Sequence, residues 1–497
     1  MPQFPTDMPE RDEAEAASLA PSPPLALPAR GLGVWGSGLT ARDVSVAAVM
    51  ALAWPAIGEQ VLNAIIGLTD TVIAGHLPGS PQTVAAATAA VGLMTYIQWF
   101  AGLMTAALGV GATAIVARSI GAGRPNLARR VTGTSVTAAF AIGLATAIML
   151  FVFARPVVYA CRLHGQAALF AIQYLSIMVV TISLQTAAQI GMAALRGAGN
   201  TFQPMMIMLM VMVINGIFST AFTYGWLGAP AWGLRGDAFG TLLAYLTGGI
   251  CTTIILFANT GKLTIRLRHL RLVPHLLTRV VKVGFPSFVE GILLWAGQFL
   301  IVLFVMNAAT DPNGYTLAAH VSVLRIESIA FLPGFGFGIA ASTMVGQYLG
   351  AGRLDQARLA GKLATLLGLG TMTALALPMV FAPRFMLGLI VTSQPVINTG
   401  LWPMVLAGLA QPGFALAICF SGALKGAGET FWPMVVTLGG IFIARFGTLG
   451  VLWPMWHEGL PAASLTAVWI GILVDLSLRG LLNYGAFYRV AWHKRRV

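Results

Sequence analysis

The eleven residues Leu195-Arg-Gly-Ala-Gly-Asn-Thr-Phe-Gln-Pro-Met205 are repeated as Leu424-Lys-Gly-Ala-Gly-Glu-Thr-Phe-Trp-Pro-Met434, with eight of the eleven positions identical. Gly121-Ala-Gly-Arg124 likewise returns as Gly350-Ala-Gly-Arg353, and Pro55 and Glu59 return as Pro286 and Glu290. The offsets of 229 to 231 residues show that two halves of the chain share one pattern. Duplicated halves in a membrane protein are typical of secondary transporters, in which two packed bundles move around a shared central site.

The composition is that of a membrane protein. Hydrophobic residues make up 57% of the 497 residues and charged residues only 9%, whereas a soluble domain carries roughly 25% charged residues. Because backbone groups in lipid must bond internally, the long apolar spans are predicted to be helices. They lie near 46–75, 83–109, 130–153, 167–193, 204–226, 238–258, 280–308, 316–345, 362–382, 398–422, 431–453 and 463–487. The sequence therefore predicts an all-α polytopic membrane protein with about twelve transmembrane helices in two pseudo-symmetric six-helix lobes.

The segments between and beyond the spans complete the predicted domain organisation. Residues 1–43, rich in proline, alanine and acids, are expected to be a disordered cytoplasmic tail. Residues 44–260 form the predicted N-lobe and 280–488 the C-lobe. Between them, 261–279 read as a basic amphipathic cytoplasmic linker suited to anionic headgroups, and 489–497 form a basic cytoplasmic tail.

The net charge of +13 is explained by topology and not by nucleic acid. With the N-terminus inside, 22 of the 29 basic residues fall on the inner side and four on the outer side, and three lie within spans. This imbalance follows the positive-inside rule, so both termini are expected in the cytoplasm, the membrane being a bacterial inner (plasma) membrane. Three scattered cysteines imply neither a disulfide framework nor a zinc site.

Several motifs together resemble the multidrug and toxic compound extrusion (MATE) family. They are Pro55 with Asp70-Thr-Val-Ile-Ala-Gly-His76, Ala117 with Gly121-Ala-Gly123, Ala194-Leu-Arg-Gly-Ala-Gly199, Asn215, Ala341 with Val345-Gly-Gln347 and Gly350-Ala-Gly352, and 424–428. The resemblance covers about 44–488. It implies a V-shaped pair of six-helix lobes that exports organic, often cationic, compounds in exchange for inward-moving H⁺ or Na⁺.

The first span carries acids at membrane depth, where a charge costs at least about 2.5–3.5 kcal/mol and needs a partner or a function. Glu59 and Asp70 are eleven positions apart, about 20° from eclipsed on a helix, and Asn63 and Gly67 fall near the same stripe. One hypothesis is a cation-coupling site at Asp70, where the carboxylate takes up H⁺ or Na⁺. The alternative is a structural carboxylate that only hydrogen-bonds neighbouring helices.

The resemblance assigns partners to this hypothesis. Asp70 matches the first-helix aspartate that closes the family's N-lobe cation site, Asn215 its asparagine partner and Thr241 a threonine of the sixth helix. Ser219 stands where some members have a second acid or amide, which leaves fewer oxygen ligands for Na⁺ and favours H⁺. Glu59 is additional to that pattern and is assigned to substrate attraction or proton relay within the coupling group. No metal other than Na⁺ at Asp70 is expected.

A second set of polar residues is predicted to line the substrate cavity. It comprises Glu290, Asn63, Gln185, Gln189, Gln298, Arg325 and Glu327. Arg325 and Glu327 point to opposite sides of one helix and need partners from other helices, Glu290 being the predicted partner of Arg325. Whether they form a structural ion pair or a gating element is left open. Asp475 and Arg479, at i and i+4, are predicted to pair, and that pair and Arg445 are interpreted as structural.

These features predict a secondary active transporter that exports cationic, amphiphilic organic compounds by alternating access, in exchange for H⁺ or Na⁺ and without a cofactor. An enzyme is not expected, because no motif for a nucleotide, a metal or a nucleophile lies in the spans. The alternative within the same fold is a flippase of lipid-linked saccharides, which would need several basic residues in the cavity. The expected partners are small organic cations and membrane lipid but no nucleic acid, and the expected state is a monomer.

Overall fold

A computed structural model describes residues 44–258, 263–308, 314–452 and 461–494. The predicted tail 1–43 and part of the predicted linker therefore lie outside the described residues, as do the last residues of the chain. Within the described part all regular elements are helical. Eleven of these helices are long and apolar enough to cross a membrane, and 105–121 is a shorter apolar helix. The prediction of an all-α membrane protein with about twelve spans is confirmed.

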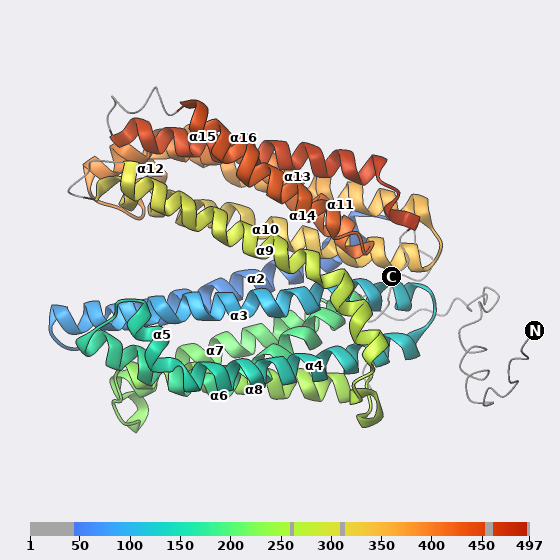
Figure 1. Cartoon of the computed structure of the whole chain (residues 1–497), viewed down its shortest axis with the longest axis horizontal. Helices are drawn as coiled ribbons and strands as arrows, with labels where there is room; N and C mark the ends of the chain where they lie inside the picture. The colour runs from blue at the N-terminus through green and yellow to red at the C-terminus, as the bar shows by residue number, and fades with distance from the viewer. Residues whose placement is uncertain (1–43, 259–262, 309–313, 453–460, 495–497) are drawn as a thin grey trace, which may run out of the picture. The chain divides into compact units, whose positions relative to one another are not determined.

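The first half of the chain forms one bundle (Figure 1). Its helices are α2 (Val46–Gly75), α3 (Pro81–Gly121), α4 (Pro125–Val152), α5 (Ala154–Ala160), α6 (Gly165–Gly197), α7 (Phe202–Tyr224) and α8 (Leu234–Phe257), with the short η1 (Trp226–Gly228) after α7. Inside this N-bundle α6 packs against α3, α4 and α8, and α7 packs against α8 and α2. Helix α8 begins four residues before the predicted sixth span, which runs over 238–258. This difference bears on a buried acid described below.

The second half repeats this arrangement as the C-bundle (Figure 1). Its elements are α9 (Pro274–Ala308), α10 (Tyr315–Gly350), α11 (Leu354–Phe381), α12 (Pro383–Gly388), α13 (Gln394–Gly426), α14 (Phe431–Leu438), the π-helical η3 (Gly439–Arg445), α15 (Phe446–Leu452) and α16 (Pro461–Arg489), with η5 (Trp492–Lys494) at the end. Here α13 packs against α10, α11 and α16. The eleventh predicted span is thus a helix with one π-helical turn.

Serine, proline and glycine set the ends of the helices. The Ser45 hydroxyl accepts a hydrogen bond from the Ala48 N–H at 3.2 Å and so caps α2. In each of the four Gly-Ala-Gly elements the second glycine has a positive φ, with 69° at Gly123, 90° at Gly199, 73° at Gly352 and 81° at Gly428. Such a left-handed residue ends a helix with little strain only when it is glycine. The repeated motifs therefore close α3, α6, α10 and α13 with the same turn.

The first glycine of each motif has a different role, which is close packing. A Cβ atom on Gly121 would lie 1.9 Å from the Gln347 carbonyl oxygen, and one on Gly350 would lie 2.1 Å from that of Arg118. Gly121 belongs to the N-bundle and Gly350 to the C-bundle, so α3 and α10 meet backbone to backbone here. The end of the helices that carries these motifs is called the motif end below.

Other contacts join the bundles in a crosswise way. Helix α2 packs on α10, and α3 packs on α9. Because α9 and α10 are the repeat-mates of α2 and α3, this exchange is the pattern that a pseudo-twofold axis between the bundles requires. Glycine again permits the approach, since a Cβ on Gly111 would meet the Val280 carbonyl oxygen at 2.2 Å and one on Gly284 that of Ala107 at 1.9 Å.

The described part of the predicted linker packs back on the N-bundle. Leu263 and Ile265 are buried in the cluster that includes α4 residues, and the Thr137 hydroxyl donates to the Leu270 carbonyl at 2.8 Å. Residues Leu267–Leu270 of this segment form η2, in which Leu267 is 77% exposed. One apolar side of the segment is thus turned to protein, while Leu267 is turned outward.

Candidate functional site

A cavity of about 590 Å³ lies between the two bundles. Its walls come from α2, α3, α6, α7 and α8 of one bundle and from α9, α10, α13, α14 and α16 of the other. The lining is mostly apolar with a few polar and charged side chains. This size and lining are those of sites for drug-sized organic molecules.

Two ion pairs stand in the cavity walls at repeat-related positions. Glu59 of α2 pairs with Arg196 near the end of α6. Glu290 of α9 pairs with Lys425 near the end of α13, with 2.8 Å between Oε2 and Nζ. All four residues line the cavity, with buried acids and partly exposed basic residues. The sequence-based interpretation of Arg196 and Lys425 as inner-side charges missed these partners.

The predicted pairing of Glu290 with Arg325 is wrong, because Glu290 is held by Lys425 and accepts a second hydrogen bond from the Thr437 hydroxyl at 3.4 Å. The side chain of Arg325 is exposed on α10 and does not line the cavity. Two residues on, Glu327 is buried and accepts a hydrogen bond from the Gln411 amide at 3.4 Å, away from the cavity lining. Their opposite orientations agree with a two-residue spacing on a helix.

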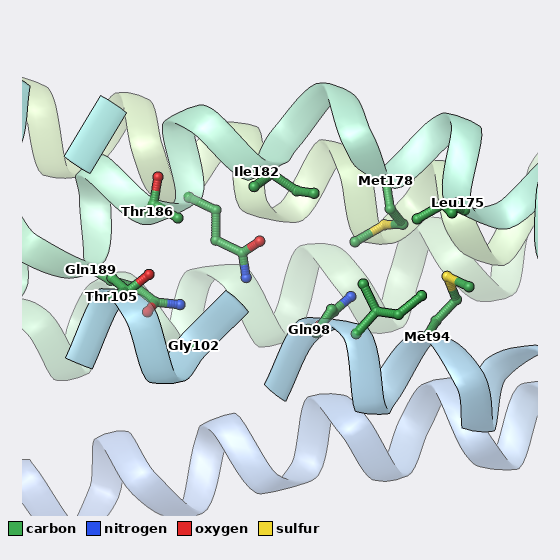
Figure 2. Close-up of a pocket in the computed structure, with 11 residues that line it drawn as sticks. Met94, Gln98, Gly102, Thr105, Leu175, Met178, Ile182, Thr186 and Gln189 are labelled. Carbon is green, nitrogen blue, oxygen red and sulfur yellow. The ribbon is translucent and has the colours of Figure 1, made fainter. Parts of the chain in front are cut away.

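Of the predicted cavity residues, Glu290, Asn63, Gln185 and Gln189 line the cavity, and so does Glu59. Gln298 does not: it is half-buried on α9, and its amide nitrogen has no hydrogen-bond partner among the described groups. A side pocket of about 30 Å³ shares Gln185 and Gln189 with the cavity and extends between α3 and α6. Figure 2 shows Gln98 and Thr105 of α3 and Gln189 of α6 around this pocket, which has room for about two water molecules.

The predicted partners of Asp70 are brought together inside the N-bundle. The Asn215 amide nitrogen lies 3.1 Å from Asp70 Oδ1, 2.9 Å from Thr241 Oγ1 and 3.3 Å from Ser219 Oγ. The Thr241 hydroxyl donates to the same Asp70 oxygen at 3.4 Å. All four residues are buried. We call this cluster, with the residues added in the next paragraph, the N-bundle centre.

Glu59 is not part of that centre, which corrects its assignment to the coupling group. A residue that the sequence analysis missed is part of it: Asp237 of α8 is fully buried and lies beside Asp70, Tyr174 and Ser219. The predicted sixth span began at residue 238, which left Asp237 in a loop, whereas α8 begins at Leu234. The Gly-Asp-Ala-Phe-Gly sequence at 236–240, with an acid between two glycines next to an apolar span, is the signal that could have found it.

Tyr245 connects the centre to the cavity. It lies one helical turn beyond Thr241 on α8, lines the cavity and feels the charge of Asp70. Tyr245 therefore borders both the cavity and the surroundings of the centre.

The C-bundle has a buried polar cluster of another kind. Asp475 accepts from Arg479 at 2.7 Å and 2.9 Å, as the i, i+4 spacing predicts, and from Arg445 at 2.9 Å. Arg445 ends the π-helical η3, a rare form of helix that is often found at functional sites. A Cβ on Gly440 would meet Asp475 Oδ1 at 2.3 Å, so glycine is required for the approach of η3 to α16. In this cluster every charge has a partner of opposite sign.

The chain has the features of a polytopic membrane transporter: a duplicated bundle of spanning helices, a cavity between the halves and buried acids within the bundles. Comparison with known proteins identifies its family. The MatE family model matches residues 55–220 and again 286–447, one match in each half. The chain belongs to the multidrug and toxic compound extrusion (MATE) family.

Named relatives agree with this membership. The chain is 28% identical over 448 residues to a probable multidrug resistance protein NorM of Thermotoga maritima, covering 90% of this chain and 93% of the relative. It is 24% identical to the multidrug resistance protein MdtK of Edwardsiella ictaluri over 90% and 95% of the two chains. It is thus similar to multidrug efflux transporters along nearly its whole length.

Solved structures give the same fold. A multidrug resistance MATE family transporter described as outward-facing superposes with a TM-score of 0.81 at 20% identity, covering 90% of this chain and 97% of that one. A transporter of the MOP superfamily from Pyrococcus furiosus, described as having a binding pocket of reverse polarity, gives 0.80 at 21% identity over 90% and 97%.

Proposed function

We propose that this chain is a secondary active exporter that moves amphiphilic organic compounds across the plasma membrane by alternating access, in exchange for inward-moving H⁺ or Na⁺. The observation that carries the proposal is the cavity of about 590 Å³ between two bundles that touch at the motif end. A site enclosed by two similar bundles can face one side of the membrane and then the other when the bundles rock. It acts as a transporter and not as an enzyme.

The two glutamate pairs bear on the chemical class of the cargo. Because Glu59 and Glu290 already hold Arg196 and Lys425, the cavity acids are neutralised before any cargo binds. The sequence-based argument for a cationic cargo, which counted acids against few basic residues, is weaker for that reason. We propose that a cationic group binds by taking the place of Arg196 or Lys425 at its glutamate, while the apolar walls hold the rest of the molecule.

The coupling ion is proposed to bind at Asp70 in the N-bundle centre. Asn215 and Thr241 hold one oxygen of this buried carboxylate. The sequence-based preference for H⁺ assumed a single acid at the site, and Asp237 removes that reason. H⁺ and Na⁺ are therefore equal candidates. The C-bundle is the weaker candidate, since Asp475 is neutralised by Arg445 and Arg479, and Glu327 is a single acid hydrogen-bonded by Gln411.

The flippase alternative is not favoured. A phosphate group would need free basic residues, and the three basic residues that line the cavity are each paired with an acid: Arg196 with Glu59, Lys425 with Glu290 and Arg479 with Asp475.

The charge imbalance places the motif end and both termini in the cytoplasm. Because the bundles are in contact at the motif end, the cavity would then be open to the outside. The chain is proposed to act as a monomer.

Transport in proteoliposomes tests the proposal. Efflux of a fluorescent amphiphilic cation is measured under an imposed pH gradient and, separately, under an imposed Na⁺ gradient, without ATP. Export is expected to follow one of the gradients and to be lost in Asp70→Asn but kept in Asp355→Asn, which removes an exposed acid at the start of α11. Export that ignores both gradients, or that survives Asp70→Asn unchanged, would contradict the proposed coupling.

A further inference from the structure

Three buried oxygen atoms in the N-bundle centre, both carboxylate oxygens of Asp237 and the amide oxygen of Asn215, make no hydrogen bond of ordinary geometry with the described groups. The hydroxyls of Ser219 and Tyr174 lie near the Asp237 carboxylate. Asp237 and Asn215 are each 0% exposed. Because an unsatisfied buried acceptor is costly, a cluster of three such acceptors needs an explanation.

Glycine packing places Asp237 in this position. A Cβ on Gly236 would lie 2.2 Å from the Phe222 carbonyl oxygen, and one on Gly240 would lie 2.2 Å from the Ser219 nitrogen. Helix α8 thus lies directly on the backbone of α7, with Asp237 between the two contacts. The Ser219 hydroxyl bonds to the Asp237 backbone carbonyl at 3.1 Å, which fixes the turn of α8 that carries the carboxylate.

The charges around Asp237 and Asp70 distinguish this pair from Glu59, Glu290 and Asp475, and also from Glu327, which is hydrogen-bonded by the Gln411 amide and feels the charge of Arg445. Glu59, Glu290 and Asp475 each contact a basic side chain. Around Asp237 and Asp70 the titratable groups that face them are Tyr174 of α6, Tyr224 of α7 and Tyr245 of α8, and the described residues place no arginine, lysine or histidine beside either acid. Arg235, on the same helix, is exposed and bonds to Gln173.

Two carboxylates in a buried site without a basic partner cannot both stay ionised and uncompensated. A proton shared with one of them, or a small hard cation ringed by oxygens, would compensate them, and hard cations are held by carboxylate, carbonyl and hydroxyl oxygens. The orientation of the Asn215 amide fits this, since its nitrogen faces Asp70 and its oxygen stays free as a ligand.

We propose that Asp237 is a second cation-binding carboxylate of the N-bundle centre, and that Asp237, Asp70 and the free amide oxygen of Asn215 together take up a monovalent cation, H⁺ or Na⁺. The inference rests on the proposed function, because it deepens the coupling site assigned there to Asp70. The proposed site then has two carboxylates, Asp70 on α2 and Asp237 on α8.

The test measures cation binding by the purified full chain in nanodiscs, apart from transport. Binding of ²²Na⁺ is measured at pH 8, and proton uptake is measured with a pH dye when the sample is taken from pH 8 to pH 5. The variants are Asp237→Asn, Asp70→Asn and the control Asp355→Asn, which removes an exposed acid at the start of α11. Asp237→Glu, which keeps the charge but moves it by one methylene, is made in case Asp237→Asn does not fold.

If Na⁺ is the cation, Asp237→Asn and Asp70→Asn each weaken its binding at least about tenfold, and Asp237→Glu weakens it too. If the cation is H⁺, wild type binds no Na⁺, and each of the two asparagine variants takes up fewer protons than wild type and the Asp355→Asn control.

Unchanged Na⁺ binding and proton uptake in Asp237→Asn, with a loss in Asp70→Asn, would overturn the role of Asp237 and leave the proposed function standing. If Na⁺ is the cation and Asp237→Asn does not fold, Asp237→Glu with the Na⁺ affinity of wild type would overturn it as well. No effect in either asparagine variant would refute the coupling site itself.

Discussion

Substitution of Gly121 by alanine is expected to separate the two bundles at the motif end. The new Cβ would lie 1.9 Å from the Gln347 carbonyl oxygen, while real Cβ atoms essentially never come closer than 3.0 Å. The atom it meets belongs to the backbone of the last turn of α10, so no side-chain rotation relieves the clash. Helix α3 must therefore move from α10 by at least about 1.1 Å.

Overpacking of this kind costs about 1–3 kcal/mol. The cost should fall on the state in which α3 touches α10, because the three atoms nearest to the new Cβ all belong to Gln347 of α10. The ratio of motif-end-closed to motif-end-open molecules should then fall about 5- to 150-fold. Gly350→Ala, with 2.1 Å to the Arg118 carbonyl oxygen, is expected to act in the same direction.

Spin-label distances between Arg124→Cys and Arg353→Cys report this change, because both positions are exposed on the turns that follow the two motifs. The labels are placed in a chain whose Cys161, Cys251 and Cys419 are alanines. Gly123→Ala is the matched control: it strains a positive φ of 69° but meets nothing within 4 Å. A short-distance population that persists in Gly121→Ala, or that is lost equally in Gly123→Ala, would refute the reasoning.

The remaining predictions concern charge and pH. Glu290→Gln leaves Lys425 unpaired and should cost about 1–3 kcal/mol, and the double variant with Lys425→Gln should recover at least half of the loss in thermal unfolding; additive losses would contradict a direct pair. Asp475→Asn leaves Arg445 and Arg479 facing each other without their acid, so a loss of about 3–5 kcal/mol is expected, and an unfolding midpoint equal to wild type would disprove it. Burial first, and then Arg268, Arg129, Arg130 and Arg266, lower the pKa of His269 below its ordinary 6.5. The unfolded chain thus binds this proton more readily, and the stability that His269 contributes is lost as pH falls through 6.5; His269→Asn should flatten that slope between pH 7.5 and 5.5.

Long apolar segments and a repeated motif were sufficient to predict the fold. Each span needs about 20 apolar residues whatever its neighbours are, so the spans can be read locally, and the repeat shows that they fall into two sets. The cluster of Asp70, Asn215 and Thr241 was predicted for another reason, which is resemblance to a family whose motifs this chain carries. Those three residues indeed lie within hydrogen-bonding distance of one another.

The partners of the charged residues could not be predicted in the same way. Arg196 and Lys425 stand near helix ends, where basic residues are ordinary, and only the folded arrangement of the helices brings them to Glu59 and Glu290. Arg325 was chosen as a partner because it lies within a span, yet its side chain points outward. Asp237 was missed by a boundary error of a few residues, which is the part of a sequence-based assignment that is least certain.

The duplication itself indicates where cation binding can be linked to movement. The ion pair in the cavity wall occurs in both bundles, but Asp70 has Ile301 as its repeat-mate, and Ile301 lies in an apolar cluster with 0% exposure. A cation bound in the N-bundle alone can change the bundle arrangement only through elements that reach the other bundle. Helix α2 is such an element: it carries Asp70 and Glu59, and a Cβ on Gly336 of α10 would meet its Ile57 nitrogen at 2.8 Å. The N-bundle centre, the cavity and an inter-bundle contact thus share one helix, so we expect a shift of α2 against α10 to carry coupling through the proposed cation site.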